Sequence, residues 1–372
     1  MRVAIDSGPL TGGHSVRGVG VSVRGLIDAL HKFNTDKNVV VEAVDFFQAD
    51  LNDFDILHYT SFNPYFLNIP RIGFAGKKVI LTIHDLIPLL YRNHYRQGIR
   101  GAVKFLINKL LVGQVDKVIS VSETSKKDIV RFLGINEKKV EVIYWGVDLR
   151  FRKINDKEKL AKVAKVYRLP NKFILYVGDV NYNKNLSTLV EASRIVKLPL
   201  VIVGKQAAAI DELIKNNLSR QSGFRDKARE ILGITHPEIA HLTELLYLMN
   251  SNRVLTTGFV PANDLVAIMN LASVYCQPSY YEGFGLPVLE AFACETPVVI
   301  SKTQALVEIA GGSAAVAKPN SAGDFANKIS FSLKDSSDRL RMIRAGSKRV
   351  KQFTWRETAE KTVKLYKSLS EI

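Results

Sequence analysis

The chain alternates short runs of β-branched residues with amphipathic helical patterns, and this alternation restricts its fold more than any other feature. In the first half, helical patterns fit residues 21–33, about 99–114 and 123–133. Strands that alternate with helices imply βαβ crossovers and a mostly parallel sheet. The predicted strands of this half are Val3–Asp6, Val39–Val44, Ile56–Tyr59, Val79–Ile83, Val118–Val121 and Val140–Tyr144.

A second series of the same kind follows, so we predict an α/β protein with two Rossmann-like, doubly wound domains and a central cleft between them as the ligand site. The predicted organisation is a first domain at 1–150, a linker at 151–171, a second domain at 172–353 and a C-terminal helix at 354–372 that packs back on the first domain. The second domain's predicted strands are Phe173–Val177, Pro199–Val203, Val254–Thr257, Val274–Gln277 and Pro297–Ile300, and its predicted helices are about 186–196, 262–272, 287–294 and 322–333.

Composition excludes several classes of protein. Two cysteines among 372 residues cannot form a disulfide framework or a four-ligand zinc site. The N-terminus lacks the apolar segment of a signal peptide, and we find no metal motif and no membrane span. With only two cysteines, we expect a protein of the reducing cytoplasm. A formal net charge of +16 suits a nucleic acid, an anionic lipid or a phosphorylated small molecule as partner.

The segment Glu282–Glu290 is the strongest candidate for a site. Gly283 and Gly285 leave backbone N–H groups unobstructed just before a helix that Pro287 is suited to begin. Exposed amides at a helix N-terminus bind anions such as a diphosphate, and the two carboxylates can accept hydrogen bonds from sugar hydroxyls. The alternative is a Gly-Pro turn with two solvated glutamates.

Two glutamates separated by seven residues around Gly-Phe-Gly-Leu-Pro resemble the E-x7-E motif of the retaining glycosyltransferases of family 4, which have the GT-B fold. The resemblance implies that Glu290 holds the ribose of a nucleotide-sugar donor and that Glu282 contacts the donor sugar as a catalytic residue. It assigns contacts with sugar hydroxyls and the diphosphate to the amides of Gly283, Phe284, Gly285 and Leu286. It implies a donor that is a substrate, with neither metal nor cofactor.

A second match is the strand, glycine, polar loop and lysine of Tyr176–Leu186. A lysine at the end of such a loop can neutralise a phosphate as a point charge. Lys184 matches the diphosphate-binding lysine of the family. Many members carry an arginine just after the glycine or just before the lysine. This chain has Asp179 and Asn183 at those two positions, so donor affinity needs another basic group or the donor differs. The alternative reading of Lys184 is a solvated surface lysine.

A glycine cluster follows the first predicted strand and includes Gly18 and Gly20. It is not the dehydrogenase fingerprint, because Val23 stands where the third glycine should be. It resembles the family's glycine loop before the first helix, which closes over the donor phosphates and the acceptor. A flexible surface loop is the alternative.

The segment from His84 to Pro88 ends a predicted strand and resembles the His-Asp-x-x-Pro of family members, many of them mannosyltransferases. The resemblance gives His84 a catalytic place facing the donor sugar, and it favours GDP-mannose over UDP-glucose. A neutral imidazole there could hydrogen-bond a sugar hydroxyl or accept a proton from the acceptor. A lone histidine at the end of a strand also serves as a structural residue.

Residues 86–115 are basic and contain no Asp or Glu. A basic amphipathic helix here can bind an anionic membrane surface or line a cleft for a phosphorylated or lipid-diphosphate acceptor; otherwise it docks and solvates its basic face. The basic residues are Arg92, Arg96, Arg100, Lys104 and Lys109, and the apolar stripe is Ile99, Val103, Leu106, Leu110 and Leu111.

Together these features predict a metal-independent, retaining hexosyltransferase that moves mannose from GDP-mannose to a glycan, lipid-linked or small-molecule hydroxyl. It would lie in the cytoplasm or on the inner face of the plasma membrane. Nucleic acid is not expected as a partner, because aromatic residues do not interleave with the basic ones. The alternatives are a GT-B nucleotide-sugar epimerase and a basic membrane- or polyanion-binding protein with a degenerate donor site.

Overall fold

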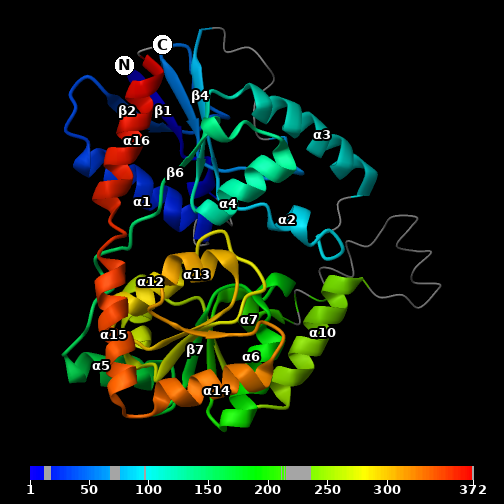
Figure 1. Cartoon of the computed structure of the whole chain (residues 1–372), viewed down its shortest axis with the longest axis vertical. Helices are drawn as coiled ribbons and strands as arrows, with labels where there is room; N and C mark the ends of the chain where they lie inside the picture. The colour runs from blue at the N-terminus through cyan, green and yellow to red at the C-terminus, as the bar shows by residue number, and fades with distance from the viewer. Residues whose placement is uncertain are drawn as a thin grey trace. The chain divides into compact units, whose positions relative to one another are not determined.

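The computed structural model describes residues 1–11, 18–67, 76–95, 98–210, 212, 214 and 236–370. Residue contacts divide the chain into two compact units (Figure 1). Unit 1 takes in Met1–Leu90, Arg96–Asp148 and Lys351–Ile372. Unit 2 takes in Tyr91–Tyr95 and Leu149–Val350.

Unit 1 is built on a six-stranded sheet in the order β2-β1-β3-β4-β5-β6, in which every neighbouring pair is parallel. All six strands predicted for this half are present, with ends that differ by one or two residues. The strands are β1 (Arg2–Asp6), β2 (Val40–Val44), β3 (Ile56–Tyr59), β4 (Lys78–Ile83), β5 (Lys117–Ser120) and β6 (Val140–Val142).

The first long helix of unit 1 begins earlier than the sequence predicted. Gly18 and Gly20, expected in a loop, form the first turn of α1, and Gly20 is buried. The amides of a first turn have no acceptor within the helix. The helices are α1 (Gly18–Phe33), α2 (Ile87–Leu90), α3 (Gly98–Gln114), α4 (Glu123–Asp128) with a π-helical turn (Ile129–Leu133), and α16 (Trp355–Ser370).

The C-terminal helix α16 packs along α1 within unit 1 (Figure 1). The Thr354 hydroxyl accepts a hydrogen bond from the Glu357 amide, as the first residue of a capping box does. The Trp355 indole lies against Gly25, where a Cβ would come within 2.2 Å of the ring. A glycine in the middle of α1 therefore makes room for the start of α16.

A buried histidine joins α16 to the sheet. His58 on β3 is fully buried, with Nδ1 2.7 Å from the Tyr366 hydroxyl on α16 and Nε2 2.8 Å from the Thr82 hydroxyl on β4. Burial lowers the pKa of His58 from its ordinary value to about 3. The neutral ring thus holds three elements of unit 1 together.

Because the pKa of His58 is lowered, we predict that unit 1 loses stability in acid. The unfolded chain protonates His58 near pH 6.5, while the folded chain stays neutral until about pH 3. The free energy of unfolding should therefore fall as the pH drops from 6.5 toward 4, by up to about 1.4 kcal/mol per pH unit.

Tryptophan fluorescence during urea unfolding reports this change, because both tryptophans of the chain, Trp145 and Trp355, lie in unit 1. We expect His58→Gln to reduce the dependence on pH without abolishing it, because His84, a second histidine of unit 1 whose pKa burial lowers, keeps its own contribution. The same change at His31, which is exposed on α1, should leave the dependence as it is. A parent protein whose unit 1 is equally stable at pH 7 and pH 5 would contradict the assignment.

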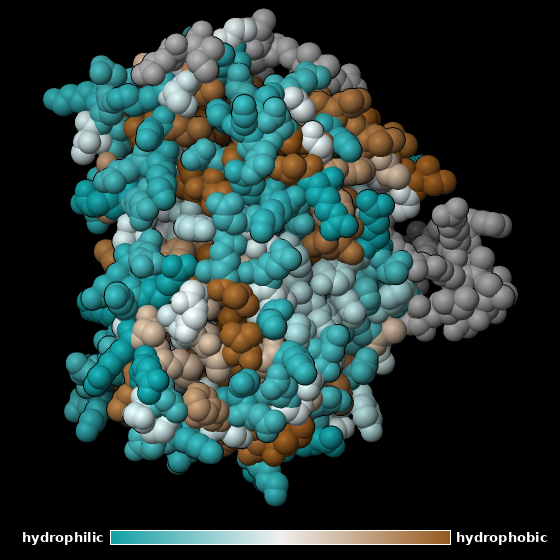
Figure 2. All heavy atoms as spheres, viewed as in Figure 1, coloured by the Kyte–Doolittle hydropathy of each residue, from teal (hydrophilic) through white to brown (hydrophobic). Residues whose placement is uncertain are grey.

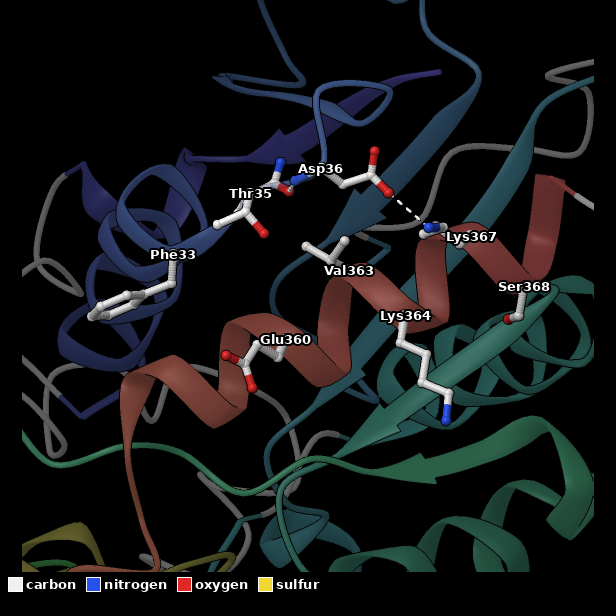
Figure 3. Close-up of a pocket in the computed structure, with 9 residues that line it drawn as sticks. Phe33, Thr35, Asp36, Glu360, Val363, Lys364, Lys367 and Ser368 are labelled. Carbon is white, nitrogen blue, oxygen red and sulfur yellow. Dashed lines mark hydrogen bonds and ion pairs between the residues drawn. The ribbon is translucent and has the colours of Figure 1, made fainter.

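A groove of about 400 Å³ lies where the end of α1 meets α16 (Figure 3). An ion pair of 2.7 Å between Lys367 and Asp36 spans one side of it. Its lining mixes both signs of charge and includes none of the predicted site residues: Phe33, Asn34, Thr35, Asp36, Glu360, Val363, Lys364, Lys367 and Ser368. The groove belongs to the packing of α16.

Unit 2 has a second parallel sheet, in the order β12-β11-β10-β7-β8-β9. The chain builds outward from β7 in one direction and then from β10 in the other, so the topological switch point lies between these two strands. The strands are β7 (Ile174–Val177), β8 (Leu200–Val203), β9 (Val254–Gly258), β10 (Val274–Gln277), β11 (Val298–Ser301) and β12 (Ala315–Ala317).

Unit 2 contains all four helices that the sequence predicted for it. Helix α13 and strand β12 were not predicted. Part of the segment 205–252 lies outside the described residues. Residues 151–171, predicted as a linker, contain α5, which packs on α11. The helices are α5 (Lys157–Val166), α6 (Leu186–Val196), α7 (Lys205–Ala208), α10 (Pro237–Asn250), α11 (Ala262–Leu271), α12 (Leu286–Ala293), α13 (Gln304–Ala310), α14 (Ala322–Leu333) and α15 (Ser337–Val350).

Candidate active site

The loops that follow β7 and β10 carry the candidate donor site of unit 2. These two strands flank the switch point of the sheet, where open α/β sheets bind their ligands beyond the carboxyl ends of the strands. Lys184 ends a short 3-10 helix (Tyr182–Lys184) after β7, and Glu282 lies in the loop after β10. The fold thus brings together two predicted site residues that are 98 positions apart.

Lys184 and Glu282 form an ion pair. The Lys184 ammonium donates to both carboxylate oxygens, at 2.9 Å to Oε1 and 2.8 Å to Oε2. Glu282 is buried, and the Lys184 side chain is 20% exposed. Lys184 is therefore not a solvated surface lysine, and its charge already has an anionic partner in this structure.

Two neutral donors from the neighbourhood of β10 also reach Glu282. The Ser279 hydroxyl donates to Oε1 at 2.6 Å, and the Gln277 amide donates to the same oxygen at 2.7 Å. The buried Tyr275 hydroxyl in turn donates to the Gln277 carbonyl oxygen. Sequence reasoning missed these three residues, since a buried strand ending in Gln-Pro-Ser carries no motif that singles them out.

The asparagines on either side of Lys184 hold its loop in place. The Asn185 amide donates to the carbonyls of Pro278 and Pro319 at 2.9 and 2.7 Å, and Asn185 has a φ of 53°. Asn183, which stands where many family members carry arginine, is buried and accepts a hydrogen bond from the Tyr95 hydroxyl at 2.6 Å. Position 183 thus has a structural use in this chain.

An aromatic cluster surrounds Tyr182 beside this loop. The His94 ring stacks on Tyr182 with centroids 3.5 Å apart and planes 11° apart. Nδ1 of His94 lies 3.4 Å from a carboxylate oxygen of Glu238. Burial lowers the pKa of His94 to about 4 and raises that of Glu238 to about 7, so this contact is a neutral one between those pH values.

The glycine segment leads into α12 as predicted. Gly285 precedes the helix with a φ of 108°, and Pro287 is in its first turn. A Cβ at Gly285 would come within 2.8 Å of Leu306. Glu290 lies one turn into α12 and is 8% exposed, as is Glu282, so neither glutamate is a freely solvated side chain.

Comparison with known families decides where this chain belongs. Residues 157–349 match the family model described as "Glycosyl transferases group 1", and residues 43–151 match "Glycosyltransferase Family 4". The chain belongs to glycosyltransferase family 4. Both matches include predicted site residues, His84 in the second and Lys184, Glu282 and Glu290 in the first.

Curated relatives of this family 4 chain include mannosyltransferases. A serotype-specific mannosyltransferase WbdA of Escherichia coli is 25% identical over 319 residues, which cover 82% of this chain and 36% of WbdA. O-antigen chain mannosyltransferase B of Escherichia coli is 26% identical over 300 residues, 79% of this chain and 71% of that protein. The chain thus spans about a third of the length of WbdA.

Solved structures share the fold of this family 4 chain. Sucrose-phosphate synthase from Thermosynechococcus elongatus superimposes with a TM-score of 0.69 at 21% identity, covering 100% of this chain and 99% of that one. HepE of Anabaena, in complex with UDP and glucose, gives a TM-score of 0.69 at 16% identity, with 100% of each chain covered. The two parallel α/β sheets and these neighbours confirm the predicted GT-B fold.

The remaining predicted residues of the family 4 site lie on unit 1. His84 follows β4, and its Nε2 lies 3.0 Å from the Thr60 carbonyl oxygen. Burial lowers the pKa of His84 to about 4, so the ring is neutral at pH 7 and its Nε2 is the donor. Trp145 packs nearby, with ring centroids 5.7 Å apart. Gly18 and Gly20 lie at the start of α1 on the same unit.

Among the described ranges, three or more His, Cys, Asp or Glu side chains nowhere gather as they would around a metal ion. Within the same ranges, none of the helices is both long and apolar enough to cross a membrane.

Proposed function

We propose that this chain transfers a hexose, with mannose favoured and GDP-mannose as donor, to a hydroxyl acceptor with retention of anomeric configuration. The membership of family 4 supports sugar transfer from a nucleotide sugar. The two mannosyltransferase relatives and the His84–Pro88 segment support mannose. The acceptor is a glycan, a lipid-linked sugar or a small molecule.

The observation that carries the proposal is the Lys184–Glu282 pair at the switch point of the second sheet. A cation and a carboxylate, both shielded from water, lie beside the glycine segment that begins α12. A diphosphate suits a cation beside the backbone amides of a helix N-terminus, and the attached sugar needs an acceptor of hydrogen bonds. One site supplies all three.

In the proposed reaction the bond between C1 of the sugar and the diphosphate oxygen breaks, with the electron pair leaving on the diphosphate. Lys184 and the amides of Gly283–Leu286 stabilise that charge. The acceptor oxygen bonds to C1 on the face the diphosphate has left, and its proton passes to a diphosphate oxygen. Glu290 holds the donor ribose. On unit 1, His84 and the amides of Gly18 and Gly20 keep, as proposals, the roles that the family resemblance implies for them.

Release of nucleoside diphosphate from a panel of nucleotide sugars tests this function. We expect slow hydrolysis without an acceptor, fastest with GDP-mannose, and no loss of rate when a chelator of divalent metals is added. A protein that releases no nucleoside diphosphate from any donor, and that no donor protects against thermal unfolding, would contradict the proposal.

The exposed side chains of helix α3 suggest an anionic lipid surface as a second partner. The apolar stripe predicted for this region points outward except for Leu111. Ile99 is 72% exposed and Leu110 71%, whereas Leu111 lies on the buried side of α3 with Gly101, Asn108 and Val112. Figure 2 shows hydrophobic residues at the upper right, where α3 lies in Figure 1. Arg96 lies outside the described residues.

The positive charge of α3 favours an anionic lipid surface as its partner. Helix α3 carries Arg100, Lys104 and Lys109, all exposed, and its sequence has no acidic residue. An apolar stripe flanked by cations suits acyl chains beneath anionic headgroups. We therefore propose that α3 rests on an anionic membrane surface.

Co-sedimentation with vesicles tests this surface. We expect replacement of Arg100, Lys104 and Lys109 by Ser to weaken binding to anionic vesicles about a hundredfold, from about 1 kcal/mol per cation. Serine at Ile99, Leu106 and Leu110 should weaken it similarly. Serine at Val166 and Ile195, which are exposed hydrophobic residues of unit 2, should not. Binding that survives both sets of changes, or dimerisation that requires α3, would overturn this part of the proposal.

A further inference from the structure

The two carboxylate oxygens of Glu282 have different surroundings. Oε1 accepts hydrogen bonds from the Ser279 hydroxyl at 2.6 Å, the Gln277 amide at 2.7 Å and Lys184 at 2.9 Å. Within the described part of the chain, Lys184 is the one donor to Oε2, at 2.8 Å. Oε1 is therefore held by two neutral donors and the lysine, whereas Oε2 is held by the lysine.

The hydrogen bonds that lead to Oε1 all donate in the same direction, from Tyr275 through Gln277 to Glu282. Tyr275 is fully buried, and burial raises the pKa of its hydroxyl well above the ordinary value, so the hydroxyl keeps its proton and donates to the Gln277 carbonyl oxygen. This turns the Gln277 amide nitrogen toward Ser279, at 2.9 Å, and toward Glu282. The reverse orientation would set a carbonyl oxygen against the carboxylate.

The donors also differ in which element carries them. Gln277 ends β10, and Ser279 lies two residues further along the loop that contains Glu282. Lys184 comes from the other side of the switch point, after β7. Motion of the lysine therefore leaves Gln277 and Ser279 in place. Gln277, Ser279 and Glu282 are each at least nine-tenths buried.

We propose that Gln277 and Ser279 are positioning residues that hold Oε1 of Glu282, so that Oε2 accepts a hydroxyl of the donor sugar once Lys184 moves onto the diphosphate. Tyr275 sets the orientation of Gln277. The inference rests on the proposed function, because it needs a nucleotide sugar in this site. Before the donor binds, Lys184 stays paired with Glu282, and the diphosphate then replaces the carboxylate as its partner.

The test compares kcat and KM of Ser279→Ala and Gln277→Met on the donor that the parent protein turns over fastest, and on its four monodeoxy analogues. We expect each variant to lose about tenfold to a hundredfold in kcat with the full donor, since a carboxylate that has lost a donor is less well held. On the analogue that lacks the hydroxyl bound by Oε2, the parent should be slow and the variants scarcely slower.

Ser332→Ala is the matched control, because Ser332 is a buried serine of α14 whose hydroxyl donates to the Lys328 carbonyl. It should keep parental kcat on every donor. If Ser279→Ala does not fold, Gln277→Met and Tyr275→Phe carry the same comparison. A loss that is equal on all five donors would overturn the positioning role. A parent protein that turns over no donor would instead overturn the proposed function.

Discussion

Lys184→Met is expected to lower kcat/KM for the nucleotide sugar by about 10²–10³-fold, which is the usual loss when a group that stabilises developing charge is removed. The substitution keeps most of the length of the side chain and deletes the cation that pairs with Glu282 at 2.8 Å. Because it also leaves a buried carboxylate without its counter-charge, we expect unit 2 to lose about 3 kcal/mol of stability. Steady-state assays and hydrogen exchange at β10 and α12 measure the two effects.

The double variant with Glu282→Gln separates catalysis from stability. A neutral amide at 282 needs no cation, so the double variant should regain most of the stability that the single variant loses. It should remain as inactive as the single variant, because neither charge is available to the donor. Recovery of transfer activity in the double variant would show that the pair serves folding alone.

Gly285→Ala should have the second large effect. Gly285 has a φ of 108°, a conformation that costs an L-residue about 1–2 kcal/mol, and a Cβ there would meet Leu306 at 2.8 Å. The start of α12 must shift to relieve both, which moves the amides proposed to bind the diphosphate. We expect donor affinity to fall about tenfold or more, measured by calorimetric titration with nucleoside diphosphate.

Gly323→Ala provides the comparison for this change. Gly323 lies within α14, and a Cβ there meets no other atom within 4 Å. Alanine is the better helix former by about 1 kcal/mol, so this variant should be at least as stable as the parent and bind equally well. Equal binding by Gly285→Ala would remove the glycine segment from the donor site.

The order of strands and helices could be predicted because nearly every buried strand is a run of β-branched residues between helical patterns. β12 was missed because Ala315–Ala317 is three residues long and follows a Gly-Gly-Ser-Ala stretch that is typical of a loop. The start of α1 was placed too late, because Gly18 and Gly20 are poor helix formers by propensity and only the contacts of unit 1 make them helical.

Side-chain contacts between distant segments were beyond prediction. Lys184 and Glu282 were each singled out, yet nothing in their spacing says that they pair before a donor arrives. The stripe on α3 was predicted from its period, but the period does not say which side of the helix is buried; Asn108 and Val112 are buried, while Leu106 is exposed. The domain boundaries and the roles of the site residues stay predictions.

A crystal structure with nucleoside diphosphate bound tests the central claim most directly. We predict that the ammonium of Lys184 lies about 2.7–2.9 Å from a diphosphate oxygen, the distance of a charge-assisted hydrogen bond, and that it has left Oε2 of Glu282. The amides that begin α12 should point at the same diphosphate. A diphosphate bound elsewhere, with Lys184 still on Glu282, would contradict the account.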